Sequence, residues 1–318
     1  MIQFKAISIL VLGALVVQGC GPAFSLAPRS TLAKAGPDGS SLTRSVSAVC
    51  VANQHVRDNA CVACGAGTTN AAGDDASGAN TSCYAGMPSC QGLAANCGAG
   101  ESCCASPTVT GGMFNGDNNA SYPATVSSFR LDKYEVTVGR FRNFVAAVVG
   151  GWKPASGSGK HTHLNSGAGL ANTGGGFEPG WDAINWNTST NLPTDKATWD
   201  GYLSCDAPYQ TWTPSSGGNE VKPINCVNWY QSAAFCIWDG GFLPSEAEWN
   251  YAAAGGNEQR QYPWSLPASS TTIDCSYANY YGAAGFCVAP PDGSTSVVGS
   301  VSPKGNGLYG HADLGGNV

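Results

Sequence analysis

The segment Phe242-Leu-Pro-Ser-Glu-Ala-Glu-Trp-Asn-Tyr-Ala-Ala-Ala-Gly-Gly256 contains a complete helix signal. Ser245 stands three residues before Glu248, which is the spacing at which the two side chains cap a helix start reciprocally. The glycine pair at 255–256 follows, and glycine ends helices because it accepts a left-handed backbone. The segment therefore predicts a short helix from Ser245 to the glycine pair.

Two further helices are predicted upstream of this segment. Asn228-x-x-Gln231 is a second capping box, and it opens a helix that runs to Trp238 with Gly240 after it. Thr137 caps an earlier helix, in which apolar residues are spaced to form one buried face: Phe141, Phe144, Val145 and Val148. Residues 129–136 alternate apolar and polar residues before this cap, which predicts a half-buried strand.

The composition favours a loop-rich globular body with aromatic packing. Charged residues make up 11% of the chain, aromatic residues 10%, and there are 43 glycines. A chain rich in aromatics and poor in charge packs a core, and many glycines allow irregular backbone. The net charge is −6 and no basic cluster occurs, which excludes nucleic acid as a partner.

Fragments in a fixed order resemble the sulfatase-modifying-factor family, whose type member is the formylglycine-generating enzyme. The resemblance covers residues 106–318, and we assign 88–318 to the domain. It is carried by 129–144, 222–238, 242–256 with Tyr262-Pro-Trp264, Asn306-Gly-Leu-Tyr309, and Asp313-Leu-Gly-Gly-Asn-Val318. The resemblance implies an α+β fold related to C-type lectins, with much irregular structure.

The resemblance also implies an activity and a limit to it. Enzymes of the family oxidise a substrate-protein cysteine to formylglycine with molecular oxygen and copper, which two cysteines hold in a segment after Trp-Glu-Trp. The sequence ends at Gly316-Asn317-Val318, so we expect a domain that is incomplete at its C-terminus, with no catalytic residue in 1–318. Copper is expected only if a further segment carries the cysteine pair. The alternative is a non-catalytic, lectin-like surface module that binds an exported protein or a glycan.

Two family positions differ here, because Phe242 and Ala254 stand where family members usually carry arginine. Both differences remove a positive charge.

Structural calcium is the other implication of the resemblance. One site would take Asn279, the Tyr280 carbonyl, Asp292 and the Ser294 carbonyl, and a second would take Asp313, Gly316 and Val318. Oxygen ligands of this mixed kind suit a hard cation. The alternative is that Asn279, Asp292 and Asp313 are ordinary turn residues.

Fourteen cysteines favour an exported protein with disulfides. Residues 50–84 have almost no large apolar residues, so this segment needs covalent cross-links. Cys61-x-x-Cys64 is also the spacing of a zinc half-site or a redox pair, but disulfides are favoured. Cys103 and Cys104 are adjacent and should each reach a different partner. The disulfide candidates of the small segment and of the lead-in to the main domain are Cys50, Cys61, Cys64, Cys83, Cys90, Cys97, Cys103 and Cys104.

Within the domain, the resemblance assigns a structural role to Cys205, Cys226, Cys236, Cys275 and Cys287. It suggests Cys275 and Cys287 as a local pair. The odd number implies that one cysteine of this group has its partner beyond Val318.

The N-terminus predicts export and lipid anchoring. Lys5 precedes the apolar run 6–17, which is too short to span a bilayer but has the length of a signal-peptide core. Val17-Gln18-Gly19-Cys20 resembles a bacterial lipobox, so 1–19 is the signal peptide and Cys20 the lipidated residue. A simple secretory signal is the alternative. Residues 20–49 are the flexible tether, which places the protein at the cell envelope, facing the periplasm or exterior.

Two local patterns in the loop region 150–222 have competing interpretations. His161-x-His163 could clamp a metal, but histidines in a Gly/Ser-rich loop are expected to be solvated. Trp152, Trp181 and Trp186 could stack on a sugar, but core packing is favoured.

Overall fold

The structure is a computed structural model that describes residues 21–22, 50, 54–63, 68–69, 76–77, 84–93, 96–207, 209–282, 285–288 and 295–318. It contains two compact units, one of Leu26–Pro88 and one that combines Met1–Ser25 with Ser89–Val318. No helix among the described residues is both long and apolar enough to cross a membrane.

The smaller unit contains short antiparallel strand pairs. β2 (Gln54–Arg57) pairs with β3 (Ala60–Ala63), and β4 (Thr68–Thr69) pairs with β5 (Tyr84–Ala85). A disulfide joins Cys50 and Cys61, and both residues pack with the buried Val56. The candidates Cys64 and Cys83 lie outside the described residues. The 3₁₀ helix η1 (Pro88–Cys90) leads into the larger unit.

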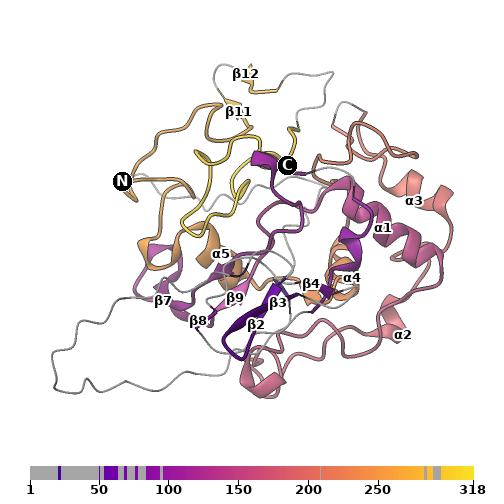
Figure 1. The fold of residues 1–318 in the computed structure, drawn as a ribbon, viewed down its shortest axis with the longest axis horizontal. Helices are drawn as coiled ribbons and strands as arrows, with labels where there is room; N and C mark the ends of the chain where they lie inside the picture. Colours follow the sequence, from indigo (N-terminus) through magenta and orange to yellow (C-terminus); the bar gives the residue numbers. More distant parts are fainter. Residues whose placement is uncertain are drawn as a thin grey trace. The chain divides into compact units, whose positions relative to one another are not determined.

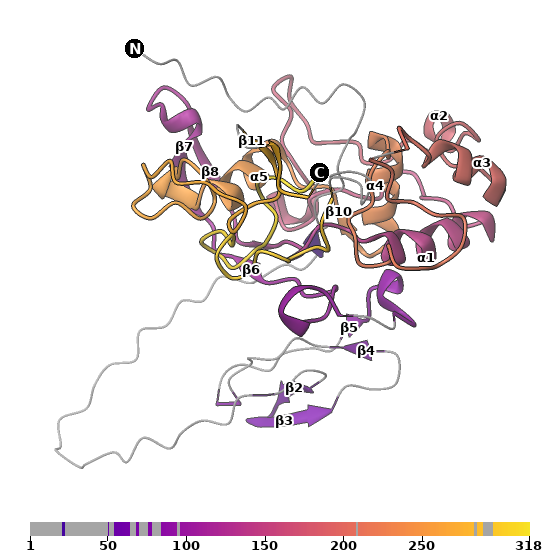
Figure 2. The same ribbon diagram turned by 90° about the horizontal axis from the view of Figure 1, so that it is seen from above.

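The larger unit mixes short helices and two-stranded sheets, which confirms the α+β class (Figures 1 and 2). Its α-helices are α1 (Val138–Val149), α2 (Ala183–Trp186), α3 (Lys196–Tyr202), α4 (Trp229–Trp238) and α5 (Glu246–Ala253). The 3₁₀ helices are η2 (Gly98–Gly100), η3 (Gly116–Asn118), η4 (Asn165–Gly167) and η5 (Gly256–Glu258).

The strands of this unit pair antiparallel in twos. β6 (Thr108–Val109) pairs with β9 (Phe129–Arg130), β7 (Gly112–Asn115) with β8 (Pro123–Val126), and β11 (Tyr281–Gly282) with β12 (Gly285–Phe286). β1 (Gly21–Pro22) pairs with β10 (Gly241–Phe242), so these two residues of the predicted tether lie against the domain.

The predicted caps are present at all three helices. Thr137 accepts a hydrogen bond from the Arg140 amide at the start of α1, and complete capping boxes open α4 and α5. The strand predicted over 129–136 was wrong beyond Arg130, because the chain bends at Lys133 and Tyr134. Asp132 is buried, so the alternation of apolar and polar residues does not separate a core face from a solvent face here.

The main core lies between α1, α3 and α4, which sit side by side in both views (Figures 1 and 2). Phe141 of α1 stacks on Phe235 of α4 with ring centroids 5.6 Å apart, and Trp199 of α3 meets both Phe141 and Phe144 edge-on. A second core, in which β7 and β8 pack on α5, contains Phe114, Val126 and Tyr251. Aromatic packing thus replaces an extended sheet as the organising contact.

Disulfides fix the irregular parts of the larger unit. The described pairs are Cys90–Cys104, Cys97–Cys103, Cys205–Cys226 and Cys275–Cys287. Cys236 is also disulfide-bonded, with a partner outside the described residues. Since no described cysteine is free, the expectation that one of the five domain cysteines lacks a partner in this chain does not hold.

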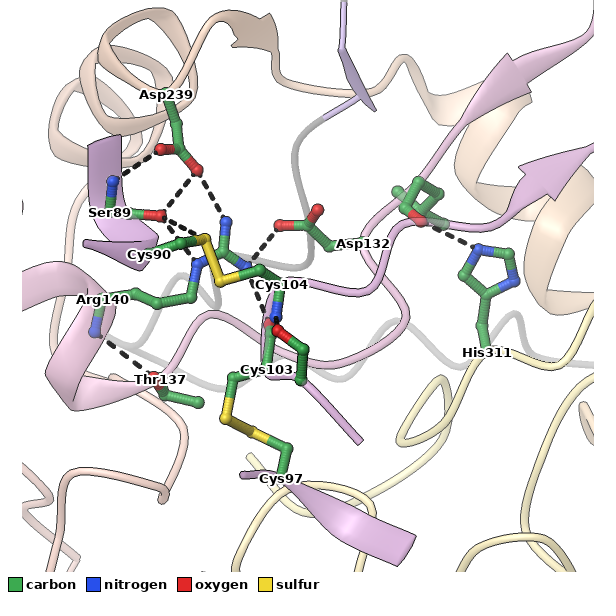
Figure 3. Close-up of polar contacts among 12 residues, drawn as sticks. Ser89, Cys90, Cys97, Cys103, Cys104, Asp132, Thr137, Arg140, Asp239 and His311 are labelled. Carbon is green, nitrogen blue, oxygen red and sulfur yellow. Dashed lines mark hydrogen bonds and ion pairs between the residues drawn. A yellow bond between two sulfur atoms is a disulfide. The ribbon is translucent and has the colours of Figure 1, made fainter. Parts of the chain in front are cut away.

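Arg140 is the fully buried charge at the centre of this unit (Figure 3). Its guanidinium lies 2.7 Å from Asp132 Oδ2 and 2.7 Å from Asp239 Oδ2, and all three side chains are at most 1% exposed. Arg140 Nε also donates to Ser89 Oγ, whose hydroxyl donates to Asp239. The network joins α1 to the end of α4, to the segment at Asp132 and to the start of the unit.

Replacing Arg140 with methionine should destabilise the protein by about 3–5 kcal/mol, because two buried carboxylates would lose their cation. Urea unfolding of the full chain measures this change. Lys196→Met is the matched control, since Lys196 is 50% exposed in its pair with Asp200 and should contribute at most about 0.5 kcal/mol. Equal unfolding midpoints for the two variants would contradict a stabilising role of the buried Arg140 network.

Candidate functional site

Two carboxyl groups that are far apart in the sequence are buried together in the larger unit. Glu135 is 3% exposed and Asp313 is 5% exposed. Burial raises the pKa of Asp313 to about 6. Burial, and then the charge of Asp313, raises the pKa of Glu135 well above its ordinary value. Raised pKa values on neighbouring carboxyl groups show that local positive charge is lacking.

Two asparagines connect this acidic cluster to the 279 region. Asn317 Nδ2 donates to Glu135 Oε2 at 2.7 Å, and Asn279 Nδ2 donates to Asn317 Oδ1 at 3.2 Å. The Asn317 amide donates to the Asn279 carbonyl at 2.8 Å, and the Ser296 amide donates to Asn317 Oδ1. The hydrogen bonds with Glu135, Asn279 and Ser296 therefore fix the side-chain orientation of Asn317.

The backbone of 313–317 is bent to make this approach. Asp313, Gly316 and Asn317 have φ angles of 57°, 89° and 82°, all in the left-handed region. A Cβ atom at Gly316 would lie 2.6 Å from the Asn279 carbonyl oxygen. Position 316 requires glycine because its φ is positive and because a Cβ atom would collide with the Asn279 carbonyl. The close approach of Gly316 holds the segment 313–317 beside Asn279.

Several residues of the two predicted calcium sites lie near one another, and the prediction of calcium itself stays a prediction. Asn279 lies beside Gly316 and Asn317, while Asp313 and the Val318 backbone amide act on Glu135, raising and lowering its pKa respectively. The Tyr280 carbonyl accepts a hydrogen bond from the Cys287 amide at 3.1 Å. Asp292 and Ser294, the other predicted ligands, lie outside the described residues.

Sequence reasoning missed Glu135. The sequence did contain a signal for a buried carboxyl group. In the predicted strand, Glu135 falls on the same side as Phe129 and Leu131, both of which are buried. A carboxyl group on an apolar face needs a compensating partner. The Asp313 turn lies 178 positions later, and only the tertiary structure brings it close.

The donor atoms of this cluster fit a hard cation. Glu135 Oε1 is buried and makes no hydrogen bond to a described residue. Carboxylate, amide and carbonyl oxygens are the ligands that Ca²⁺ takes, about six to eight at a time. No group of three or more described His, Cys, Asp or Glu side chains is placed to hold a metal ion. A cation beside Glu135 and Asp313 would therefore need backbone and amide oxygens as well.

A second polar cluster lies where the sequence predicted solvated histidines, and that prediction was wrong. The side chains of His161 and His163 are 7% and 5% exposed. His161 Nε2 lies 3.2 Å from Glu248 Oε2, and His163 Nε2 lies 2.9 Å from Glu248 Oε1. Both rings pack against Phe242, with centroids 4.5 Å and 5.1 Å from it. The two imidazole rings thus contact the Glu248 carboxylate beside the neutral Phe242.

A pocket of about 300 Å³ lies beside this cluster. Its walls are mainly apolar and include Trp181, Trp186, Trp229 and Ile237, with His161 and Glu178 as polar members. Trp181 is 3% exposed and belongs to the main core, while Trp152 and Trp186 pack against that core. Core packing is therefore the main role of these indoles, and two of them also form the pocket wall.

Comparison with known proteins assigns most of the chain to one family. Residues 99–318 match the family described as the sulfatase-modifying factor enzyme 1-like domain. The formylglycine-generating enzyme of Mus musculus is 35% identical over 99 residues, which is 30% of this chain and 25% of the enzyme.

Other relatives carry different names. The inactive C-alpha-formylglycine-generating enzyme 2 of Bos taurus is 37% identical over 75 residues, 23% of this chain and 22% of that protein. The serine/threonine-protein kinase pkn1 of Chlamydia pneumoniae is 35% identical over 101 residues, 32% of this chain and 13% of the kinase. The aligned segments span a quarter or less of these relatives, which include an enzyme named for the reaction and one named inactive.

Proposed function

Because this chain belongs to the sulfatase-modifying-factor family, we propose that it is an exported protein with a formylglycine-generating type of domain. In this proposal, the protein oxidises a cysteine of an exported partner protein to formylglycine with molecular oxygen. The cysteine gives two electrons and releases its sulfur as sulfide, and a thiol reductant supplies the other two electrons that reduce the oxygen. The match of residues 99–318 to the family is the observation that carries the proposal. The likeness to the mouse enzyme supports the same reaction, over 30% of this chain.

The described residues contribute the scaffold in this proposal and not the redox centre. Copper chemistry in the family uses two cysteine thiolates, and every described cysteine is in a disulfide. A disulfide sulfur is not a thiolate ligand. Turnover therefore requires a cysteine pair outside the described residues.

A co-expression experiment tests this function. The full-length protein is expressed with a sulfatase-type peptide, and the peptide mass is read after incubation with copper and oxygen. We expect conversion of the target cysteine to an aldehyde and no change in a matched peptide with serine in its place. An unmodified cysteine peptide, with copper bound to the protein, would rule the oxidase function out.

A non-catalytic, lectin-like module that binds protein or glycan is the second candidate function. Two observations favour it: no described cysteine is free, and one relative is named inactive. In this case the oxidation experiment fails, while immobilised full-length protein still retains an exported protein or a glycan from an array. Failure of both experiments would exclude both functions.

We further propose that calcium stabilises the domain through the acidic cluster. Glu135, Asp313, Asn279 and backbone oxygens near Gly316 would supply the ligands, and the cation would offset two buried carboxylates. Adding CaCl₂ to EDTA-treated protein at neutral pH should raise the melting temperature. At one hundred times Kd the stabilisation would be about 2.7 kcal/mol.

Glu135→Gln and Asp313→Asn should each remove most of this response, since each deletes a carboxylate ligand. Asp274→Asn is the matched control, because Asp274 is an exposed aspartate whose bonds are to Ser276 and Lys304. An identical calcium response in all four proteins, including the wild type, would exclude this cluster as the calcium site.

The envelope location is the last part of the proposal, and it rests on the lipobox-like sequence at 17–20. Cys20 lies outside the described residues. Expression in cells fed an alkyne fatty acid should label the wild type, and Cys20→Ser should abolish labelling because the acylated sulfur is gone. Cys61→Ser is the control for general cysteine loss. Labelling that survives Cys20→Ser would place the lipid elsewhere.

A further inference from the structure

The two histidines lie on a glycine-rich loop of residues 158–180, which is closed at its base. The Gly157 amide donates to the Trp181 carbonyl at 2.9 Å, and the Trp181 amide donates to the Ser158 carbonyl at 2.8 Å. Between these bonds the regular structure of the loop is one 3₁₀ turn, at Asn165–Gly167, and one antiparallel bridge between Ala171 and Phe177. A loop with so little regular structure depends on a few side-chain contacts for its position.

Glu178 is the centre of the loop's own hydrogen bonds. Its Oε1 accepts from the His161 amide at 2.6 Å and from the Leu170 amide at 2.9 Å. The Glu178 amide donates to the Leu170 carbonyl at 2.8 Å. Glu178 and His161 therefore move with the loop as one piece.

His161 connects this loop to α5. Its Nδ1 lies 3.0 Å from Glu178 Oε1, while its Nε2 lies 3.2 Å from Glu248 Oε2. Each ring nitrogen thus faces a carboxylate, and only the protonated imidazolium has N–H groups on both nitrogens. Neutral histidine would turn a lone pair toward one carboxylate. The geometry therefore selects the charged form.

The contact between His161 and Glu248 matters for the domain because Glu248 is buried and caps α5. Its side chain is 4% exposed and accepts hydrogen bonds from the amide and the hydroxyl of Ser245 at the start of α5. A buried carboxylate needs a cation or several donors. Among the described residues, the rings of His161 and His163 lie against Glu248, and the neighbouring Phe242 of β10 is neutral.

We propose that His161 is a protonation-dependent latch, which as an imidazolium bridges Glu178 to Glu248 and so holds the glycine-rich loop closed against α5. The loop supplies Gly159, His161 and Glu178 to the pocket wall, and the body supplies Trp229, Ile237 and Leu243. Opening the latch would move His161 and Glu178 away from the body side of the pocket. The proposal concerns the pocket and stands independently of the oxidase function.

The pKa shifts of His161 and Glu248 indicate whether the loop opens as the pH rises or as it falls. Burial lowers the pKa of His161, but Glu248 and Glu178 outweigh it and leave the pKa above the ordinary 6.5. Burial raises the pKa of Glu248, but both histidines outweigh it and hold the pKa far below the ordinary 4.5. The His161 contribution is complete below pH 6.5 and is lost as the pH rises through the folded-state pKa. The Glu248 contribution is complete above pH 4.5. The latch is therefore closed in mild acid and opens toward alkaline pH.

Hydrogen exchange of the full-length protein at about pH 5.5 and pH 8.5 tests the latch, with exposure times scaled for the intrinsic rate. We expect the amides of 158–180 to be less protected at the higher pH, because deprotonated His161 no longer bridges the two carboxylates. His161→Gln should leave the loop equally open at both values. His163→Gln is the matched control from the same cluster and should keep the pH dependence, because His161 still bridges both carboxylates.

A further variant keeps the test decisive if His161→Gln fails to fold. Glu178→Gln removes one of the two carboxylates, so it should move the midpoint of loop opening to lower pH. Equal loop protection of the wild type at both pH values would overturn the proposal. So would an unchanged midpoint in Glu178→Gln, or a pH dependence that His163→Gln abolishes and His161→Gln preserves.

Discussion

The buried ion network of Arg140 with Asp132 and Asp239 is the constraint around which the larger unit is organised (Figure 3). A charge with no solvent access must keep its partners in place, since losing one leaves an unpaired charge inside. Asp132 therefore fixes the chain between the end of β9 and the bend at Lys133 and Tyr134, and the segment after the bend carries Glu135 into the interior. The same segment receives the C-terminal part of the unit, because His311 Nε2 lies 3.2 Å from the Leu131 carbonyl and the Ala312 amide donates to the Lys133 carbonyl.

The two acidic environments of the domain differ in whether the protein supplies a counter-charge. Glu248 faces two imidazoles, and its pKa lies far below the ordinary value. Glu135 faces another carboxyl group, and its pKa is raised. Burial acts in the same direction on both groups, so the neighbouring charges decide the difference. The first cluster pairs its carboxylates with imidazole rings and responds to protons in the proposed latch. The second leaves a site whose charge and oxygen atoms suit a cation.

Covalent and aromatic contacts compensate for the lack of extended sheets. Every described sheet of the larger unit has only two strands, and such pairs are marginal alone. The stacked and edge-on rings between α1, α3 and α4 provide the large buried surface, and four described disulfides hold the irregular segments around it. A scaffold of this kind can carry long loops, because its stability does not depend on them. The loop at 158–180 is thus free to serve a pocket.

The sequence by itself determined the local features of this protein: its capped helices, its family and its disulfide-rich character. Caps such as Ser245 with Glu248 depend on neighbours within one helical turn, so spacing alone reveals them. The tertiary structure decided where charges meet. The burial of His161 against Glu248 and the meeting of Glu135 with Asp313 join segments far apart in the chain. No local pattern encodes such meetings, because the free energy of a buried charge depends on whatever the fold places beside it.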